Sequence, residues 1–158
     1  MTVSVSAYTA EQVRAAERPL LDAGEPLMLR ASAALATVIA DVLGDRPHPR
    51  VLVLAGRGDN GGDALYAAER LVESGMDVDA LLTSGDAHVS ALAAAMSAGV
   101  RRIESDGLDA TEYDLIVDGI LGIGARGALR GAARAIVRAR GAAEFRAGKA
   151  VGVRWGGG

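Results

Sequence analysis

Short apolar runs alternate along the chain with longer segments in which apolar residues recur every three or four positions. The short runs predict buried strands, and the first of them spans Val51 to Ala55. Further short runs lie at 78–82, 100–103, 114–118 and 150–153. Strands that alternate with helical segments in this way predict a mostly parallel sheet with helices on both faces.

The longer periodic segments predict helices. Thr9 and Gln12 form a capping box before the first helix, and Pro26 suits the first turn of a second one. Seven residues of this second helix are expected to face the core: Leu27, Ala31, Ala34, Leu35, Val38, Ile39 and Val42. Further helices are predicted at 64–72, 86–98 and 129–140. The pattern predicts one α/β domain over 1–158, a Rossmann-like three-layer αβα fold with two N-terminal helices.

A glycine-rich polar segment, Gly56 to Asp63, connects the first strand to the helix that is expected to begin at Ala64. Its glycine spacing matches the dinucleotide fingerprint Gly-x-Gly-x-x-Gly, although such spacings arise by chance in a chain with 21 glycines. A loop of this kind presents backbone N–H groups to an anionic ligand. Asp59 and Asp63 place negative charge where a pyrophosphate would lie, and no Gly-Lys-Ser/Thr follows, which excludes a Walker loop.

A second cluster begins with Asp118, at the carboxyl end of the strand predicted at 114–118. Strand ends of a parallel sheet meet at one edge, so Asp118 is expected close to the Asn60–Asp63 loop. Converging carboxylates repel each other unless a cation or a proton intervenes. Oxygen ligands suit a hard cation such as K⁺, Mg²⁺ or Ca²⁺, and Arg126 is placed to meet a phosphate as a fork.

Composition limits the function further. The 158 residues carry a net charge of −3, which disfavours nucleic-acid binding, and no cysteine is present to form disulfides or thiolate metal sites. Neither a signal peptide nor an apolar run long enough for a membrane span is found. We therefore expect a cytoplasmic protein that has no membrane partner.

Three motifs together resemble the YjeF N-terminal domain family. They are Tyr8-Thr-Ala-Glu-Gln-Val-Arg14, Gly58-Asp-Asn-Gly-Gly-Asp63 and Asp118-Gly-Ile-Leu-Gly-Ile-Gly124, and the resemblance covers about 9–138. Enzymes of this family are NAD(P)H-hydrate (NAD(P)HX) epimerases. They interconvert the R and S forms of hydrated NADH and NADPH, and so repair damaged nicotinamide nucleotides.

The resemblance implies a set of site residues. Asn60 and Asp118 would ligate a potassium ion, and Asp59 to Asp63 would bind the phosphates and ribose region of the substrate. The segment after Asp118 would also contact substrate, with Ile123 in place of a hydroxyl residue. The implied substrate-binding residues are Asp59, Asn60, Gly61, Gly62, Asp63, Gly122, Ile123, Gly124, Ala125, Arg126, Gly127 and Ala128.

The chain departs from the family at its C-terminal end. Members continue with Val-Asp-x-Pro-Ser-Gly, which supplies an acidic residue at the substrate and a further potassium ligand. Here the acidic position holds Arg154, and the tail 141–158 resembles a frameshifted or truncated end. No catalytic residue is therefore assigned. Missing strands would leave an apolar sheet edge, a surface for aggregation or a homodimer.

Three alternatives to a working epimerase stay open. The first is a non-catalytic member of the fold that binds a nucleotide or a protein, favoured by the missing motif. The second is a fragment of a bifunctional epimerase/dehydratase that has lost its C-terminal dehydratase domain. The third is a fragment of a Rossmann dehydrogenase, which the absence of a ribose-binding acid after the second strand disfavours.

Overall fold

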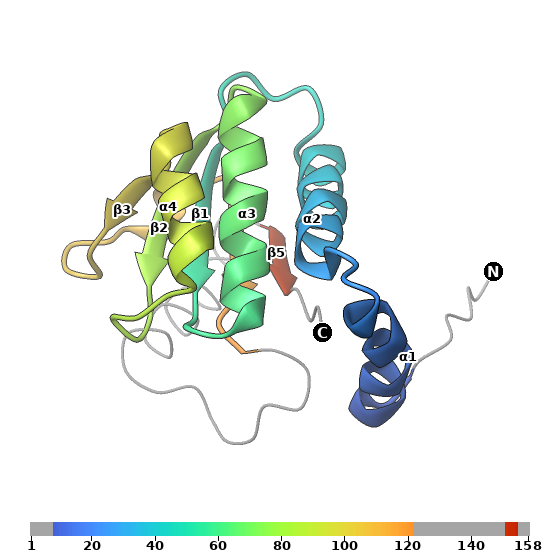
Figure 1. The fold of residues 1–158 in the computed structure, drawn as a ribbon. Helices are drawn as coiled ribbons and strands as arrows, with labels where there is room; N and C mark the ends of the chain where they lie inside the picture. Colours follow the sequence, from blue (N-terminus) through green and yellow to red (C-terminus); the bar gives the residue numbers. More distant parts are fainter. Residues whose placement is uncertain (1–7, 122–150, 155–158) are drawn as a thin grey trace.

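A computed structural model describes residues 8–121 and the backbone of 151–154. Five parallel strands form one sheet in the order β3-β2-β1-β4-β5 (Figure 1). They are β1 (Arg50–Ala55), β2 (Asp77–Leu82), β3 (Arg101–Ile103), β4 (Leu115–Gly119) and β5 (Val151–Arg154). The predicted parallel sheet and α/β fold are thus confirmed. The helix expected at 129–140 and the ligand segment expected at 122–128 lie outside the described residues.

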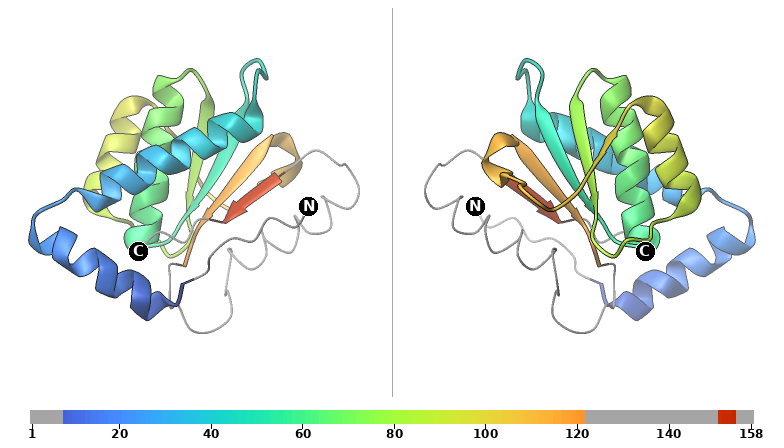
Figure 2. Two further views of the ribbon diagram at one scale, coloured as in Figure 1. Left: turned by 90° about the vertical axis from the view of Figure 1, so that its right-hand side faces the viewer. Right: turned by 90° about the vertical axis from the view of Figure 1, so that its left-hand side faces the viewer.

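Three helices cover one face of this sheet, while a fourth projects away from it beyond the start of α2 (Figures 1 and 2). The helices are α1 (Ala10–Asp22), α2 (Leu27–Leu43), α3 (Asp59–Glu73) and α4 (Val89–Ala98), with a short 3₁₀ helix η1 (Ala110–Glu112) between β3 and β4. Within the described part of the chain, none of the helices is long and apolar enough to span a membrane.

The central strand β1 is buried on both sides, as its uninterrupted apolar sequence predicts. Val51 and Val53 belong to the cluster that packs against α2, α3 and α4. Leu52 and Leu54 point to the opposite face, where Leu108 and Tyr113 from the β3–β4 connection cover them. The strict alternation of strand side chains therefore builds two apolar layers from one sequence run.

Helix α2 buries Leu35 and Ile39 as predicted, but not the whole of the side that was expected to face the core. Ser32, Leu35, Ile39 and Leu43 are its buried residues. Val38 and Val42, which were expected in the core, are 41% and 43% exposed, and Ala34 is exposed as well. The prediction was wrong for these three residues because the helix is apolar nearly all round, so that periodicity alone does not define the limits of the buried side.

Helix α1 contributes no buried side chain to the core. Its capping box is confirmed: Gln12 N donates to Thr9 Oγ1 and Thr9 N donates to Gln12 Oε1. Leu20 and Leu21 are 41% and 58% exposed. The capping hydrogen bonds therefore stabilise α1 at its N-terminal end, while packing against the core contributes little.

Near the β3 edge of the sheet, a group of polar side chains packs around Asp79, which is buried in β2. Its carboxylate accepts hydrogen bonds from Arg101 Nε and from the Tyr113 hydroxyl, both at 2.7 Å. The Arg50 guanidinium lies 3.6 Å from Asp79 and 4.9 Å from the centre of the Tyr113 ring. These contacts join three strands to the segment after η1.

The partners of Asp79 determine its ionisation. Burial raises the pKa of the Asp79 carboxyl. The hydrogen bonds from Arg101 and Tyr113, together with the nearby arginine charges, lower this pKa by more than burial raises it, so that the pKa is below its usual range. Burial and the bond to Asp79 raise the pKa of Tyr113 to about 12. Asp79 is therefore a charged acceptor, and Tyr113 a neutral donor, at neutral pH.

We expect Asp79→Asn to lower the free energy of unfolding by about 2 kcal/mol at pH 7, because two hydrogen bonds to a buried charge are weakened. The depressed pKa means that this stability is present above the unfolded-state value near 3.9 and is lost as pH falls through the folded-state pKa. Urea unfolding at pH 7 and below about pH 4 tests this. The control is Asp77→Asn, exposed on the same strand; an equal loss in both variants would contradict the prediction.

Candidate functional site

The site lies at the carboxyl edge of the sheet, where β1 leads into α3 (Figure 1). Helix α3 begins at Asp59, so the segment predicted as a loop up to Asp63 is instead its first turn. Gly62 N donates to Gly58 O at 3.1 Å and closes this turn. The prediction was wrong because two adjacent glycines favour a loop in isolation, whereas tertiary packing demands them here.

The glycines permit backbone contacts that no side chain would allow. A Cβ atom on Gly61 would collide with the carbonyl of Gly56, and one on Gly56 would collide with the carbonyl of Ile120. A Cβ on Gly119 would come within 2.6 Å of the Ala64 Cβ. The first turn of α3, the end of β1 and the end of β4 therefore lie in direct backbone contact.

This packing brings Asn60 together with the segment that follows Asp118. The Asn60 side chain is 3% exposed, and its Nδ2 donates to Leu121 O at 3.3 Å. Asp118 is half-buried, and its Oδ1 accepts from Ile120 N at 3.2 Å. The expected convergence of the two motifs on one edge of the sheet is thus present in the fold.

The polar groups brought to this edge include the Asn60 amide, the Asp118 carboxylate and the Leu121 carbonyl. Such a donor set fits a hard monovalent or divalent cation and disfavours a soft metal. Among residues 8–121, no group of three or more His, Cys, Asp or Glu side chains could hold a metal ion. Any cation at this edge would depend on amide and backbone oxygens as well as on Asp118.

The start of α3 also suits an anion. Its N-cap residue, Gly58, provides no side-chain hydrogen bond to the first turn. The first N–H groups of a helix have no intrahelical partner, and the helix dipole favours negative charge beside them. Asp59 is exposed on this turn, while Asp63 is 3% exposed.

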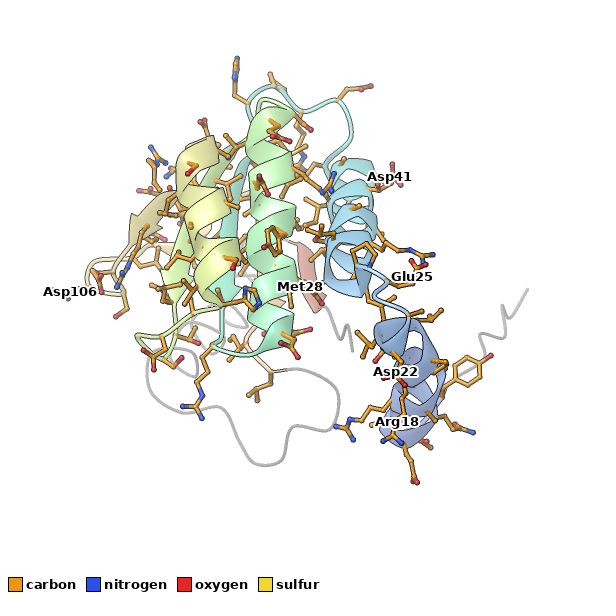
Figure 3. The ribbon with its side chains drawn as sticks, viewed as in Figure 1. Arg18, Asp22, Glu25, Met28, Asp41 and Asp106 are labelled. Carbon is orange, nitrogen blue, oxygen red and sulfur yellow. The ribbon has the colours of Figure 1, made fainter. Side chains whose placement is uncertain are left out.

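A cavity of about 310 Å³ adjoins this turn and is lined by Asp59 and Asp63 together with side chains of α1 and α2. Met28, from the start of α2, points toward α3 in Figure 3, and its sulfur lies 3.1 Å from where a Cβ on Gly62 would be. The sequence did not predict this cavity, because its walls come from helices separated by a strand and only tertiary packing brings them together.

His88 is half-buried beside the first turn of α3. Its Nδ1 accepts from Ala91 N and caps α4, which therefore begins at Val89 rather than at Asp86. The ring centre lies 6.2 Å from that of Tyr66. The His88 ring thus packs on α3 from the α4 side, beside Tyr66 of α3 itself.

A parallel sheet, a glycine-rich helix start after the central strand and polar groups at the carboxyl strand ends define an α/β domain of the Rossmann-like class. Residues 24–147 match the family described as YjeF-related protein N-terminus. The chain belongs to this family, as its three motifs indicated.

Curated relatives carry names that refer to nicotinamide nucleotide repair. The NAD(P)H-hydrate epimerase of Microbacterium testaceum is 51% identical over 140 residues, which cover 86% of this chain and 54% of the relative. The epimerase of Clavibacter michiganensis is 47% identical, over 84% of this chain and 60% of its own. The bifunctional NAD(P)H-hydrate repair enzyme Nnr of Mycobacterium tuberculosis is 43% identical, over 84% of this chain and 29% of its own.

The chain thus spans a little over half the length of the single-function relatives. Among solved structures, yeast ynu0 superposes with a TM-score of 0.78 at 19% identity, covering 95% of this chain and 69% of that protein. At that identity the likeness concerns the fold alone, and it agrees with the Rossmann-like architecture described above.

We expect Gly61→Ala to destabilise the protein by about 1–3 kcal/mol, because the new methyl group would strike the Gly56 carbonyl. Gly58→Ala is the matched control, since it precedes the same turn and a Cβ there meets nothing within 4 Å. Thermal unfolding of the two variants measures the difference. Equal unfolding temperatures would contradict the close backbone contact.

Proposed function

We propose that this chain binds hydrated NADH and NADPH and acts as the epimerase domain of nicotinamide nucleotide repair. The observation that carries the proposal is the contact between the Asn60–Asp63 turn and the segment after Asp118, in a chain 51% identical to a named epimerase. Two motifs distant in sequence form one site at the edge where α/β sheets bind nucleotides.

The start of α3 is proposed to receive the pyrophosphate. Its N-cap residue is a glycine, which leaves room for a ligand beside the first turn, and the N-terminal end of the helix dipole attracts the phosphate charge. The residues proposed from the family resemblance on this turn are Asp59, Asn60, Gly61, Gly62 and Asp63. A further part of the proposed ligand contact, 122–128, lies outside the described residues.

A potassium ion is proposed beside the substrate, held by the Asn60 amide and the Asp118 carboxylate. The oxygen-rich donor set supports this, as does the need to offset carboxylates close to phosphates. A bound cation would supply fixed positive charge and screen that repulsion. The protein's own contribution is to hold both side chains in place through Leu121 and Ile120.

Epimerisation at C6 of the nicotinamide ring requires the loss and recovery of configuration, and hence proton transfer by a positioned acid or base. The backbone register pairs Asp118 of β4 with Arg154 of β5. Arg154 occupies the position where the family resemblance places an acidic residue at the substrate. This arginine favours a second candidate function, nucleotide binding without turnover.

A dehydratase that consumes one epimer is the proposed partner. The Nnr relatives are named as bifunctional repair enzymes, and this chain covers 29% of the one from M. tuberculosis. An epimerase is useful where the consuming enzyme is stereospecific, because it returns the other epimer to the usable form. The partner reaction would therefore dehydrate hydrated NADH or NADPH.

We expect Arg154→Asp to raise the rate of R-NADHX epimerisation by about 100-fold, the lower end of the contribution of a positioned acid or base. Arg102→Asp, which introduces the same charge change on the exposed strand β3, is the control and should have no effect. Chiral chromatography of the two epimers over time gives the rate. If both variants bind NADHX but neither gains turnover, the non-catalytic function is correct.

The cation proposal predicts that Asp118→Asn raises the K⁺ concentration needed for half-maximal NADHX binding by about tenfold or more, because a charged ligand is lost. Titration calorimetry in KCl series, with ionic strength held constant by a large organic cation, measures this. Asp86→Asn, in the exposed β2–α4 connection, is the control for net charge. NADHX binding that does not depend on K⁺ in the unmodified chain would refute the ion.

A further inference from the structure

The carboxyl ends of β1 and β2 are joined by Thr83. Its backbone N–H and its hydroxyl both donate to the Ala55 carbonyl, at 3.0 and 3.2 Å. Ala55 also pairs with Leu82 in the strand register, so that the two strands run side by side to their last residues (Figure 1). The segments that begin with Gly56 and Ser84 therefore leave the sheet next to each other.

Arg57 is the only arginine or lysine in the described connections at the carboxyl ends of β1, β2 and β4. Its side chain is exposed and has no hydrogen-bond or ion-pair partner within the described part of the chain. The backbone before it is fixed, since Gly56 N donates to Gly119 O at 3.1 Å. A Cβ on Gly58 would meet nothing within 4 Å. The guanidinium thus stands beside open space at a place that the sheet determines.

The end of β2 carries hydroxyl groups and no acid. In dinucleotide-binding sheets, an acidic residue at this strand end binds the ribose 2′-hydroxyl of NAD, whereas a nearby arginine accommodates the 2′-phosphate of NADP. Here β2 ends at Leu82 and is followed by Thr83 and Ser84. Ser84 is exposed, and its hydroxyl donates to Asp86 O at 3.4 Å, a weak bond that a better acceptor can replace.

The strand order determines which part of a ligand reaches this place. The order reverses between β1 and β4, and a dinucleotide lies across such a point with one half on each side. Asn60 and Asp118 mark this point, because their segments meet there. The half of the ligand on the β1 side therefore extends over the end of β2, toward Arg57 and Ser84.

We propose that Arg57 and the Ser84 hydroxyl bind the 2′-phosphate on the adenosine ribose, and that the chain therefore prefers hydrated NADPH to hydrated NADH. The guanidinium meets a phosphate monoester as a two-pronged donor, and the serine hydroxyl adds a third. This inference rests on the proposed function and names its preferred substrate. The pyrophosphate keeps its proposed place at the start of α3.

Two probes that differ only in the 2′-phosphate test the inference: adenosine 2′,5′-bisphosphate and 5′-AMP. We expect the unmodified chain to bind the bisphosphate about tenfold more tightly, the ratio that one charge-assisted phosphate contact supplies, and Arg57→Gln to bind both alike. Titration calorimetry measures the affinities. The control is Arg102→Gln, the same charge change on the exposed strand β3, which should keep the preference.

Ser84→Asp restores the carboxylate that NAD-binding sheets carry at this strand end. Because this carboxylate repels the 2′-phosphate, the variant should bind 5′-AMP more tightly than the bisphosphate, a reversal of the preference. The inference is overturned if the unmodified chain binds the two probes equally or binds neither. It is also overturned if the preference survives in Arg57→Gln or in Ser84→Asp.

An epimerisation assay with NADPHX and NADHX on the same samples separates this inference from the proposed function. If Arg57→Gln abolishes the preference for the bisphosphate while no sample epimerises either substrate, the 2′-phosphate subsite stands and the epimerase function falls. If the unmodified chain epimerises both substrates with the same KM values as Arg57→Gln, the function holds and the role of Arg57 is refuted.

Discussion

The close backbone contact between the first turn of α3 and the ends of β1 and β4 determines the rest of the site. Gly61 packs on the Gly56 carbonyl, and Gly56 packs on that of Ile120. Because no side chain fits between these segments, Asn60 is held against Leu121, and Asp118 lies at the same edge of the sheet. The polar side chains of the site thus come together because Gly56, Gly61 and Gly119 have no side chain to keep these segments apart.

Much of the fold is predictable because the strands are short, apolar and separated by helical periodicity. The strand at Val51 to Ala55 is buried on both faces, and the run predicted at 150–153 overlaps β5 in all but one residue. Helix boundaries are less predictable. Local preference puts Gly61 and Gly62 in a loop, whereas the contact with Gly56 incorporates them into α3.

The sequence also indicated which motifs meet at one edge of the sheet, because carboxyl ends of parallel strands share an edge. It did not indicate the cavity beneath α1 or the polar network of Asp79. Both depend on residues far apart in the chain: Tyr113 reaches Asp79 across 34 positions, and Asp59 shares the cavity with Arg14. No periodicity or spacing rule encodes such contacts, which arise only once the sheet has ordered its strands.

Helix α1 has a consequence for how the domain can change during evolution. Substitutions on a helix without buried side chains alter the folding equilibrium little, since few apolar contacts are lost. The same substitutions alter the wall of the cavity beside α3 directly. The shape of this cavity can therefore change through α1 while the glycine contacts and the Asp79 network stay fixed, and such changes need little spare stability.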